Sequence, residues 1–294
     1  MKFSRPEADV FVPKGGDAAQ ALARTTHLCV IAHQDDIEIN AYPAVADCLG
    51  RADRFFTGVV MTNGAGSART GKFAHVTDAE MQVIRRDEQR TAAVLGEYNL
   101  QLQLAHPSGD VKKAGHAGVT ADLAAIFGAC RPEVVYLHQP ADKHDTHIGV
   151  FGHSLTALRQ LPTHQRPKRV FGCEVWRDLD WLADEHKVLM DVSGRDNLAA
   201  ALNGVFDSQI AGGKRYDLAT LGRRAANATF FDSHSTDAAT QLVFGLDLTP
   251  LLKMKQLEYL KLEGQIDVED IKIIDKADAG ETQIPNLMKM EETA

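Results

Sequence analysis

Apolar runs and polar loops alternate along most of the chain, with helix-like segments between the runs. Six runs are predicted to be strands, and they span residues 27–32, 54–62, 100–104, 133–138, 169–175 and 188–192. The first two, HLCVIA and RFFTGVVMT, are apolar almost without interruption, which is typical of strands buried on both faces. The pattern therefore predicts an α/β fold with a largely parallel, Rossmann-like central sheet flanked by helices.

The clearest predicted helix follows the second run and a loop rich in Gly, Ser and Thr. Thr77 and Glu80 fit a capping box, so this helix is expected to begin at Asp78. It should end at Gly96, which can supply a left-handed residue after the last turn. Further helices are predicted over residues 119–129, 197–209, 214–228 and 251–262, and the polar stretch from residue 264 onward has no assigned role.

Composition and charge indicate an ordinary globular protein and argue against nucleic-acid and membrane partners. Of the 294 residues, 44% are hydrophobic and 24% are charged, as in ordinary globular enzymes. The net charge of -8 repels a phosphate backbone, so no nucleic-acid partner is expected. No apolar run approaches the ~20 residues that cross a bilayer, and the start MKFSRPEADVF is charged, so we expect a cytoplasmic protein without membrane partners. The cysteines Cys29, Cys48, Cys130 and Cys173 are scattered singly and are expected to be reduced, mostly in the core.

Polar clusters follow two of the predicted strands, at the end where open parallel sheets bind ligands. His33, Asp35 and Asp36 follow the first strand, and His144 and His147 follow the run EVVYLH, so these residues are expected on two loops. Catalytic zinc takes three His or acidic ligands and leaves one position for water, and His33, Asp36 and His147 would supply that set. Asp35 could then take a proton from the water, and His144 could face the reacting oxygen.

Simpler and different interpretations stay open at this point. A histidine after a strand is most often a surface or capping residue, and paired aspartates can merely favour a helix N-terminus. The spacing His33-Gln34-Asp35 with a distant His147 also fits the HxD…H triad of non-haem iron oxygenases. Those enzymes carry the triad in an all-β barrel, whereas this chain alternates strands and helices. P-loop, paired-Cys zinc and GxGxxG patterns are absent from the sequence, so no nucleotide cofactor is expected.

The string AHQDDIEIN resembles the AHPDDIEIG-type signature of the LmbE-like, or PIG-L, family of metal-dependent N-acetylglucosaminyl deacetylases. MTNGAGS resembles the Gly-rich loop of that family, RRDE with a later LG resembles its RxxE…LG helix, and HDTH resembles its HPDH. MDVS with AALNGVFDSQ resembles the late segment that ends in SQ. The similarity covers about residues 27–231 of what we expect to be a single domain over residues 1–294, with a C-terminal extension over 232–294.

The resemblance implies a role for each candidate residue. These roles are metal ligand for His33, Asp36 and His147, general base for Asp35, electrostatic helper or acid for His144, and substrate binding for Arg85. An arginine on a helix is otherwise usually solvated. The expected enzyme is a zinc-dependent N-deacetylase, with Fe2+ as the alternative ion. It would hydrolyse the acetamide of an N-acetylated amino sugar (GlcNAc type) or its conjugate, a small-molecule partner, and homo-oligomer formation is left open.

The sequence also departs from the family pattern. Gln34 replaces the usual proline, which should only loosen the loop. Asp145-Thr146 replaces Pro-Asp, and Asp142 stands where some members carry a tyrosine. These changes alter the surroundings of His144 rather than the three ligands. A catalytically silent sugar-binding protein on the same scaffold is a further alternative, and the intact Asp35 and His144 oppose it.

Overall fold

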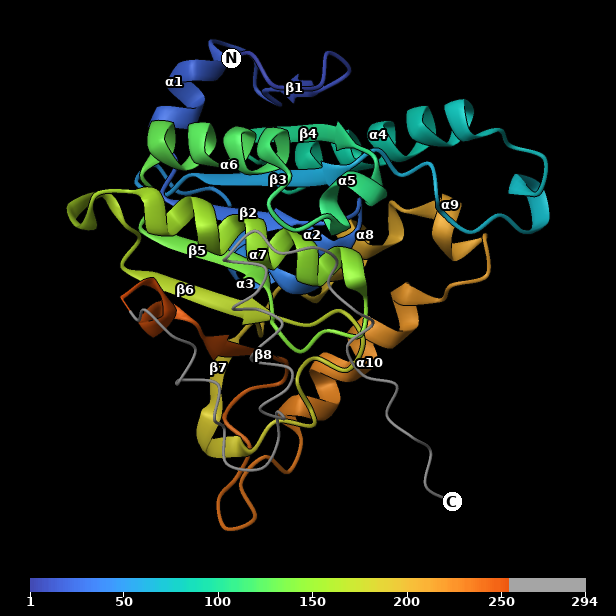
Figure 1. Cartoon of the computed structure of the whole chain (residues 1–294). Helices are drawn as coiled ribbons and strands as arrows, with labels where there is room; N and C mark the ends of the chain where they lie inside the picture. The colour runs from blue at the N-terminus through green and yellow to red at the C-terminus, as the bar shows by residue number, and fades with distance from the viewer. Residues whose placement is uncertain (254–294) are drawn as a thin grey trace.

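An eight-stranded sheet runs through the computed structural model, which describes residues 1–253 (Figure 1). Its strand order is β1-β4-β3-β2-β5-β6-β8-β7. The strands are β1 (Asp9–Phe11), β2 (His27–Ile31), β3 (Phe56–Thr62), β4 (Leu100–His106), β5 (Val134–His138), β6 (Arg169–Cys173), β7 (Lys187–Asp191) and β8 (Leu242–Asp247). The strands from β4 to β6 are mutually parallel, whereas β1 at one edge and β8 and β7 at the other are antiparallel to their neighbours. The predicted α/β fold with a largely parallel sheet is confirmed.

Helices cover both faces of this sheet (Figure 1). They are α1 (Ala18–Ala23), α2 (Asp36–Asn40), α3 (Tyr42–Cys48), α4 (Asp78–Leu95), α5 (Ser108–Lys112), α6 (Ala117–Cys130), α7 (Asp145–Gln160), α8 (Asp196–Gly204), α9 (Asp207–Ile210) and α10 (Tyr216–Ala228). Short 3-10 helices are η1 (Gly71–Phe73), η2 (Thr163–Gln165), η3 (Asp184–His186) and η4 (Thr249–Leu252). One apolar cluster contains residues of α1, α6 and α7, and the other contains residues of α2, α3, α4 and α8.

The central strand β2 explains why the apolar run in the sequence is continuous. Leu28 and Val30 belong to the cluster with α6 and α7, and Cys29 and Ile31 belong to the cluster with α3 and α4. All four side chains are fully buried. Successive side chains of a strand point to opposite faces, so a sheet that is covered on both sides needs apolar residues at every position.

Helix α4 begins as predicted and ends differently. The capping box is present, with the Thr77 side chain accepting the backbone N–H of Glu80 and the Glu80 carboxylate accepting that of Thr77. The expectation of a left-handed Gly96 is wrong, because its φ is -81° and the left-handed residue is Glu97 at φ 50°. Glycine is required at position 96 for another reason. A Cβ there would lie 2.5 Å from the ring of Tyr98, which is buried against the helix end.

All six predicted strands are present, with bounds shifted by a few residues. The predicted helices over 119–129 and 214–228 correspond to α6 and α10. The helix expected over 197–209 is instead the two helices α8 and α9, because the chain turns between them and buries the side chain of Phe206 in the core.

The sequence pattern did not predict several elements, and α7 is the most important. Its sequence DTHIGVFGHSLTALRQ mixes glycines and histidines with apolar residues, which hides the helical period. Strand β8, from the predicted extension over 232–294, pairs with both β6 and β7. The predicted helix over 251–262 lies mostly outside the described residues, where only η4 falls inside, and the stretch from residue 264 lies outside them entirely.

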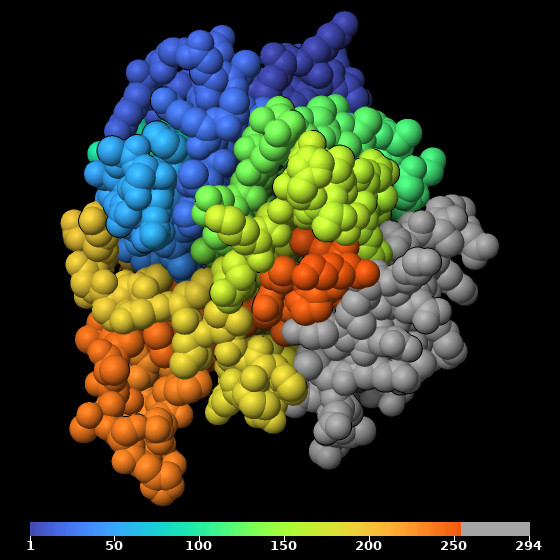
Figure 2. Space-filling view, turned by 90° about the vertical axis from the view of Figure 1, so that its left-hand side faces the viewer, coloured from blue at the N-terminus to red at the C-terminus, as the bar shows by residue number. Residues whose placement is uncertain are grey.

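Figure 2 shows the side of the molecule at the amino ends of the parallel strands, where η4 lies against the end of α7. Arg159 of α7 donates to the backbone oxygen of Leu251 at 3.0 Å, and Arg166 donates to that of Leu252.

All four cysteines are free and buried, as expected. Among the described helices, none is both long enough and apolar enough to cross a membrane.

Candidate metal centre

The two polar clusters meet at the carboxyl ends of β2 and β5, which are neighbours in the sheet. His33 follows β2 after one residue, and Asp36 is the first residue of α2. His147 lies in the first turn of α7, which follows β5. The sequence placed these residues on loops, which is wrong for two of them. The helices α2 and α7 begin inside the clusters and hold Asp36 and His147 on rigid backbone.

Donor atoms of His33, Asp36 and His147 face one another. Nδ1 of His33 lies 3.2 Å from Oδ2 of Asp36 and 3.3 Å from Nε2 of His147. The same oxygen of Asp36 lies 3.5 Å from Nε2 of His147. Ligands that bind a tetrahedral zinc ion at 2.0–2.1 Å lie about 3.3 Å from one another. The three spacings therefore fit a shared divalent ion.

Asp142 determines which nitrogen of His147 faces this set. Its Oδ2 lies 2.9 Å from Nδ1 of His147, so Nδ1 carries the proton and Nε2 keeps its lone pair for a metal. Oδ1 of Asp142 accepts the backbone N–H of His144 at 2.9 Å and the indole N–H of Trp176 at 3.0 Å. Sequence reasoning noted Asp142 only as a departure from the family pattern and did not predict its contact with His147. No motif marks the turn that brings the two residues together.

His138, the last residue of β5, lies beside the set and is engaged elsewhere. Its ring stacks on that of His147 with centroids 3.8 Å apart, and its Nε2 lies 3.6 Å from Oδ2 of Asp36. That Nε2 accepts the backbone N–H of Ala32 at 2.9 Å, and Nδ1 lies 3.3 Å from the side-chain amide of Asn40. Asp36, His138 and His147 form a second group whose donor atoms are close enough to hold a metal ion. Both ring nitrogens of His138 already have protein partners, so it is less available as a donor than His33. Sequence reasoning missed it, since it ends an ordinary buried strand.

His144 is the N-cap residue of α7. Its Nδ1 accepts the backbone N–H of Thr146 at 3.2 Å, so the proton of the neutral ring lies on Nε2. The ring stacks on His147 and on Trp176. Burial and the neighbouring His147 and His33 lower the pKa of His144 to about 4. At neutral pH this favours an uncharged N–H donor, and so the electrostatic role over the acid role.

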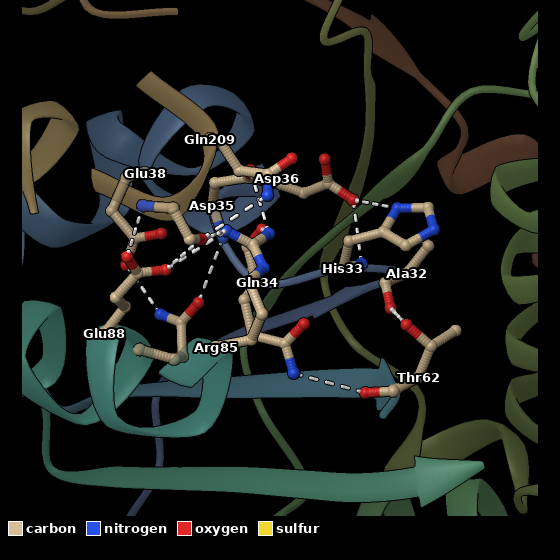
Figure 3. A network of polar contacts seen from close by, with 12 residues as sticks. Ala32, His33, Gln34, Asp35, Asp36, Glu38, Thr62, Arg85, Glu88 and Gln209 are labelled. Atoms are coloured by element: carbon tan, nitrogen blue, oxygen red, sulfur yellow. Dashed lines mark hydrogen bonds and ion pairs between the residues drawn. The ribbon is translucent and has the colours of Figure 1, made fainter. Parts of the chain in front are cut away.

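Asp35 lies between the ligand set and α4, in the positive-φ region at 91° (Figure 3). Nη2 of Arg85 lies 3.0 Å from Oδ2 of Asp35 and also donates to the backbone oxygen of Gln34. Burial raises the pKa of Asp35, and the positive charge of Arg85 opposes this rise. Arg85 is only 2% exposed, which excludes a solvated helix residue. A buried carboxylate whose proton affinity is raised by burial and adjusted by charged neighbours is typical of acid–base sites.

Further hydrogen bonds hold the loop that carries these residues (Figure 3). The side-chain amide of Gln34 donates to the backbone oxygen of Thr62 in β3 at 3.3 Å. Gln89 accepts the backbone N–H of Asp35 at 3.2 Å and donates to the carboxylate of Glu38 at 2.8 Å. The expectation that Gln34 only loosens the loop is wrong, because its buried amide ties the loop to the sheet.

The late SQ segment lies beside the site. Ser208 in α9 donates from its backbone N–H and from Oγ to the carboxylate of Glu88 in α4, both at 2.7 Å. Glu88 in turn lies 3.4 Å from Nη1 of Arg85. The two segments that resemble the RxxE and SQ motifs are thus joined through Glu88, and this contact holds Arg85 at the site.

All six residues that the sequence singled out line one pocket of about 320 Å³. They are His33, Asp35, Asp36, Arg85, His144 and His147. Gln209, from the segment that resembles the SQ motif, also lines this pocket. Sequence reasoning missed other residues of the pocket, among them Trp176, Lys214 and Tyr216. No motif marks these three, because they reach the pocket only through the return of the chain after β6. The pocket is large enough for part of a small-molecule ligand.

Comparisons with known proteins agree with this architecture. Residues 28–158 match the family described as PIG-L, GlcNAc-PI de-N-acetylase, and this segment includes all six residues singled out from the sequence. This match confirms the resemblance of the chain to the PIG-L (LmbE-like) family. A comparison with curated proteins gives no match.

Solved structures share the fold at low sequence identity. The conserved protein TT1542 from Thermus thermophilus gives a TM-score of 0.59 at 18% identity, over 76% of this chain and 94% of that chain. N,N'-diacetylchitobiose deacetylase from Pyrococcus horikoshii gives 0.59 at 16% identity, over 79% and 86%. GalB, the 4-carboxy-2-hydroxymuconate hydratase from Pseudomonas putida, gives 0.57 at 16% identity, over 76% and 96%. Since a hydratase shares this fold, the fold alone does not fix the reaction.

Proposed function

We propose that this chain, which belongs to the PIG-L (LmbE-like) family through residues 28–158, is a metal-dependent N-deacetylase. Its substrate would be an N-acetylated amino sugar of GlcNAc type or a conjugate of one. The observation that carries the proposal is the set of donor atoms from His33, Asp36 and His147, 3.2–3.5 Å apart, with Asp35 in the same pocket. The family description and the fold shared with a diacetylchitobiose deacetylase support the substrate class.

The donor set of two imidazoles and one carboxylate suits zinc and also ferrous iron. When bound, the ion supplies a Lewis acid for the amide carbonyl and for the attacking water. We favour zinc, because amide hydrolysis needs no redox chemistry. An oxygenase with an HxD…H triad would need Asp35 as a ligand. Oδ2 of Asp35 instead pairs with Arg85, and the sheet is largely parallel, so both observations oppose that alternative.

Asp35 would act as the general base. It would take a proton from the attacking water and pass that proton to the amine nitrogen as the C–N bond breaks, which leaves acetic acid and a neutral amine. Burial raises the pKa of Asp35 to about 7, in the range that suits a general base near neutral pH, and the guanidinium of Arg85 limits this rise and fixes the position of Oδ2. General-base assistance of this kind typically contributes about 10²–10⁴-fold to the rate.

His144 would stabilise the carbonyl oxygen as negative charge develops on it. Its Nε2–H has no hydrogen-bond partner among residues 1–253, and Nδ1 accepts the backbone N–H of Thr146. A preorganised neutral donor stabilises an oxyanion without a proton transfer. Arg85 would have two functions, because the side chain that meets substrate hydroxyls also positions Asp35. An Arg85→Ala variant should therefore lose kcat as well as gain KM.

The decisive experiment combines metal analysis with acetate release. Protein purified without chelators should contain about one divalent ion per chain, and it should release acetate from some members of a panel of N-acetyl amino sugars and conjugates. His147→Ala should lose both the ion and the activity. His164→Ala, an exposed histidine in η2, is the matched control and should keep both.

Two outcomes would contradict the proposal. Sugar binding without acetate release would favour the silent sugar-binding alternative, and wild-type protein without an ion would remove the metal centre. The cytoplasmic location, the single-domain organisation and the lack of nucleic-acid and membrane partners stay predictions.

A further inference from the structure

A second pocket lies next to the metal pocket. It has a volume of about 430 Å³, within the range of cavities that bind small molecules. Its lining combines Ile39 of α2 with Val175 and Trp176 after β6, and with Gly222 and Arg224 of α10. No sequence motif marks this pocket, and the proposed reaction does not use it.

Three residues line both pockets, namely Val175, Trp176 and Tyr216. Trp176 is held at the boundary, because its indole N–H donates to Asp142 at 3.0 Å and its ring is parallel to that of His144 at 6.2 Å. A molecule whose amide lies at the ligand set can therefore extend along these side chains into the second pocket.

The surface that the second pocket offers is mostly apolar, because its charged side chains are buried or paired. Arg224 is only 1% exposed, and its Nη2 donates to the backbone oxygens of Glu38 and Ile39, whereas Nε and Nη1 are buried without a hydrogen-bond partner among residues 1–253. Arg223 pairs with Asp180 at 2.9 Å. Asp178 accepts the side-chain amide of Asn227. What remains is aliphatic and aromatic surface, including the rings of Trp176 and Tyr216.

We infer that the second pocket binds an apolar substituent of the substrate, an inference that rests on the proposed deacetylase function. The amide lies at the ligand set, and the substituent packs against Trp176 and Tyr216. The substituent is either an aglycone on the sugar or an acyl chain longer than acetyl. Burial of a phenyl-sized group corresponds to about a 10- to 100-fold gain in affinity.

Three substrates test this preference. The reference is the methyl glycoside of N-acetylglucosamine, and it is compared with the phenyl glycoside and with the N-hexanoyl methyl glycoside. At least one substituted substrate should exceed the reference in kcat/KM by about 10-fold or more. A gain for the phenyl glycoside identifies an aglycone, and a gain for the N-hexanoyl compound identifies an acyl chain. Equal kcat/KM for all three overturns the inference and leaves the deacetylase function intact.

Gly222 allows the pocket to be filled. Gly222 lines the pocket, and a Cβ at this position of α10 would meet no atom within 4 Å, so the backbone has room for the first atom of the Gly222→Leu side chain. The ratio of kcat/KM between the substituted and reference substrates should then fall toward one. Gly222→Ala is the matched control and should keep the wild-type ratio. Because a ratio is measured, a general loss of activity cancels.

A probe without an amide tests the pocket independently of turnover. The chain has two tryptophans, and Trp181→Phe leaves Trp176 as the only fluorescent one. 4-Nitrophenyl β-glucoside should quench Trp176 saturably, and Gly222→Leu should abolish this quenching. No saturable quenching in the Trp181→Phe protein overturns the inference. Quenching in a protein that deacetylates none of the substrates would support the pocket and reject the proposed function.

Discussion

The two ends of the parallel sheet bury polar groups of different kinds. At the amino ends, the hydroxyls of Thr25 and Thr57 lie 2.7 Å apart, and the side-chain amide of Asn99 donates to a backbone oxygen at 2.6 Å. All of these groups are neutral and have partners. At the carboxyl ends, the buried groups include the ionisable side chains of Asp35 and Asp36, among others.

This difference indicates that the unfavourable free energy of burying ionisable groups is concentrated at the carboxyl ends of the sheet, where the candidate site lies. A neutral group that keeps its hydrogen bonds is buried at little cost, whereas each buried ion costs several kcal/mol unless it is well paired. At the carboxyl ends, Arg85 pairs with Asp35, and Nδ1 of His147 donates a hydrogen bond to Asp142. The donor atoms of His33, Asp36 and His147 face one another in the same pocket. This arrangement is expected if a bound metal ion balances the charge of the buried Asp36.

The largest expected effect is that of Asp35→Asn. This variant should lower kcat by about 10²–10⁴-fold, because the base is lost, while the metal content stays near that of the wild type. Acetate release and elemental analysis measure the two quantities. Asp47→Asn at the amino end, where a half-exposed carboxylate pairs with Arg54, is the matched control and should change neither. Near-normal activity in Asp35→Asn would mean that Asp35 is not the general base, and that the buried carboxylate at the carboxyl end matters no more for activity than Asp47 at the amino end.

His144→Asn should lower kcat by about 10²–10³-fold, the effect typical of one lost oxyanion donor. Asparagine is a good N-cap residue, so the start of α7 should stay intact, and thermal melting can verify this. If this variant keeps its activity, His144 only caps α7, and another group faces the reacting oxygen.

Asp142→Asn should weaken metal binding by about 10–100-fold, because the carboxylate that orients His147 loses its charge. Competition with a chelator of known affinity measures this change. Asp122→Asn is the control, since it alters another buried Asp–His pair, 3.0 Å from His106, outside the ligand set. Equal metal affinity in wild type and Asp142→Asn would mean that Asp142 serves packing alone.

The smallest expected effect concerns strain at the amino ends. Arg131 ends α6 in the left-handed region at φ 46°, where glycine is preferred. Arg131→Gly should raise the free energy of unfolding by up to about 1 kcal/mol without any change in activity. Denaturant unfolding measures it, with Arg131→Ala as a control that gains nothing. A loss of activity in Arg131→Gly would show that positive-φ strain at the amino end also serves function.

The sequence by itself determined six of the eight strands of the sheet and the candidate residues of the site. Apolar runs predicted the six strands because a residue buried on either face must be apolar, and this requirement is local. The motif after β2 and the histidines after β5 predicted that the candidate ligands and their neighbours lie close together, since parallel strands bring their carboxyl ends to one edge.

The tertiary structure decided which partners these residues have. Asp142 orients His147, Arg85 pairs with Asp35, and His138 is occupied by Ala32. It also decided that Trp176 and Tyr216 stand between two pockets. Most of these contacts join segments far apart in the chain, and even the short link from Asp142 to His147 depends on the turn before α7. Local periodicity does not encode such contacts, because their geometry exists only once the helices have packed on the sheet.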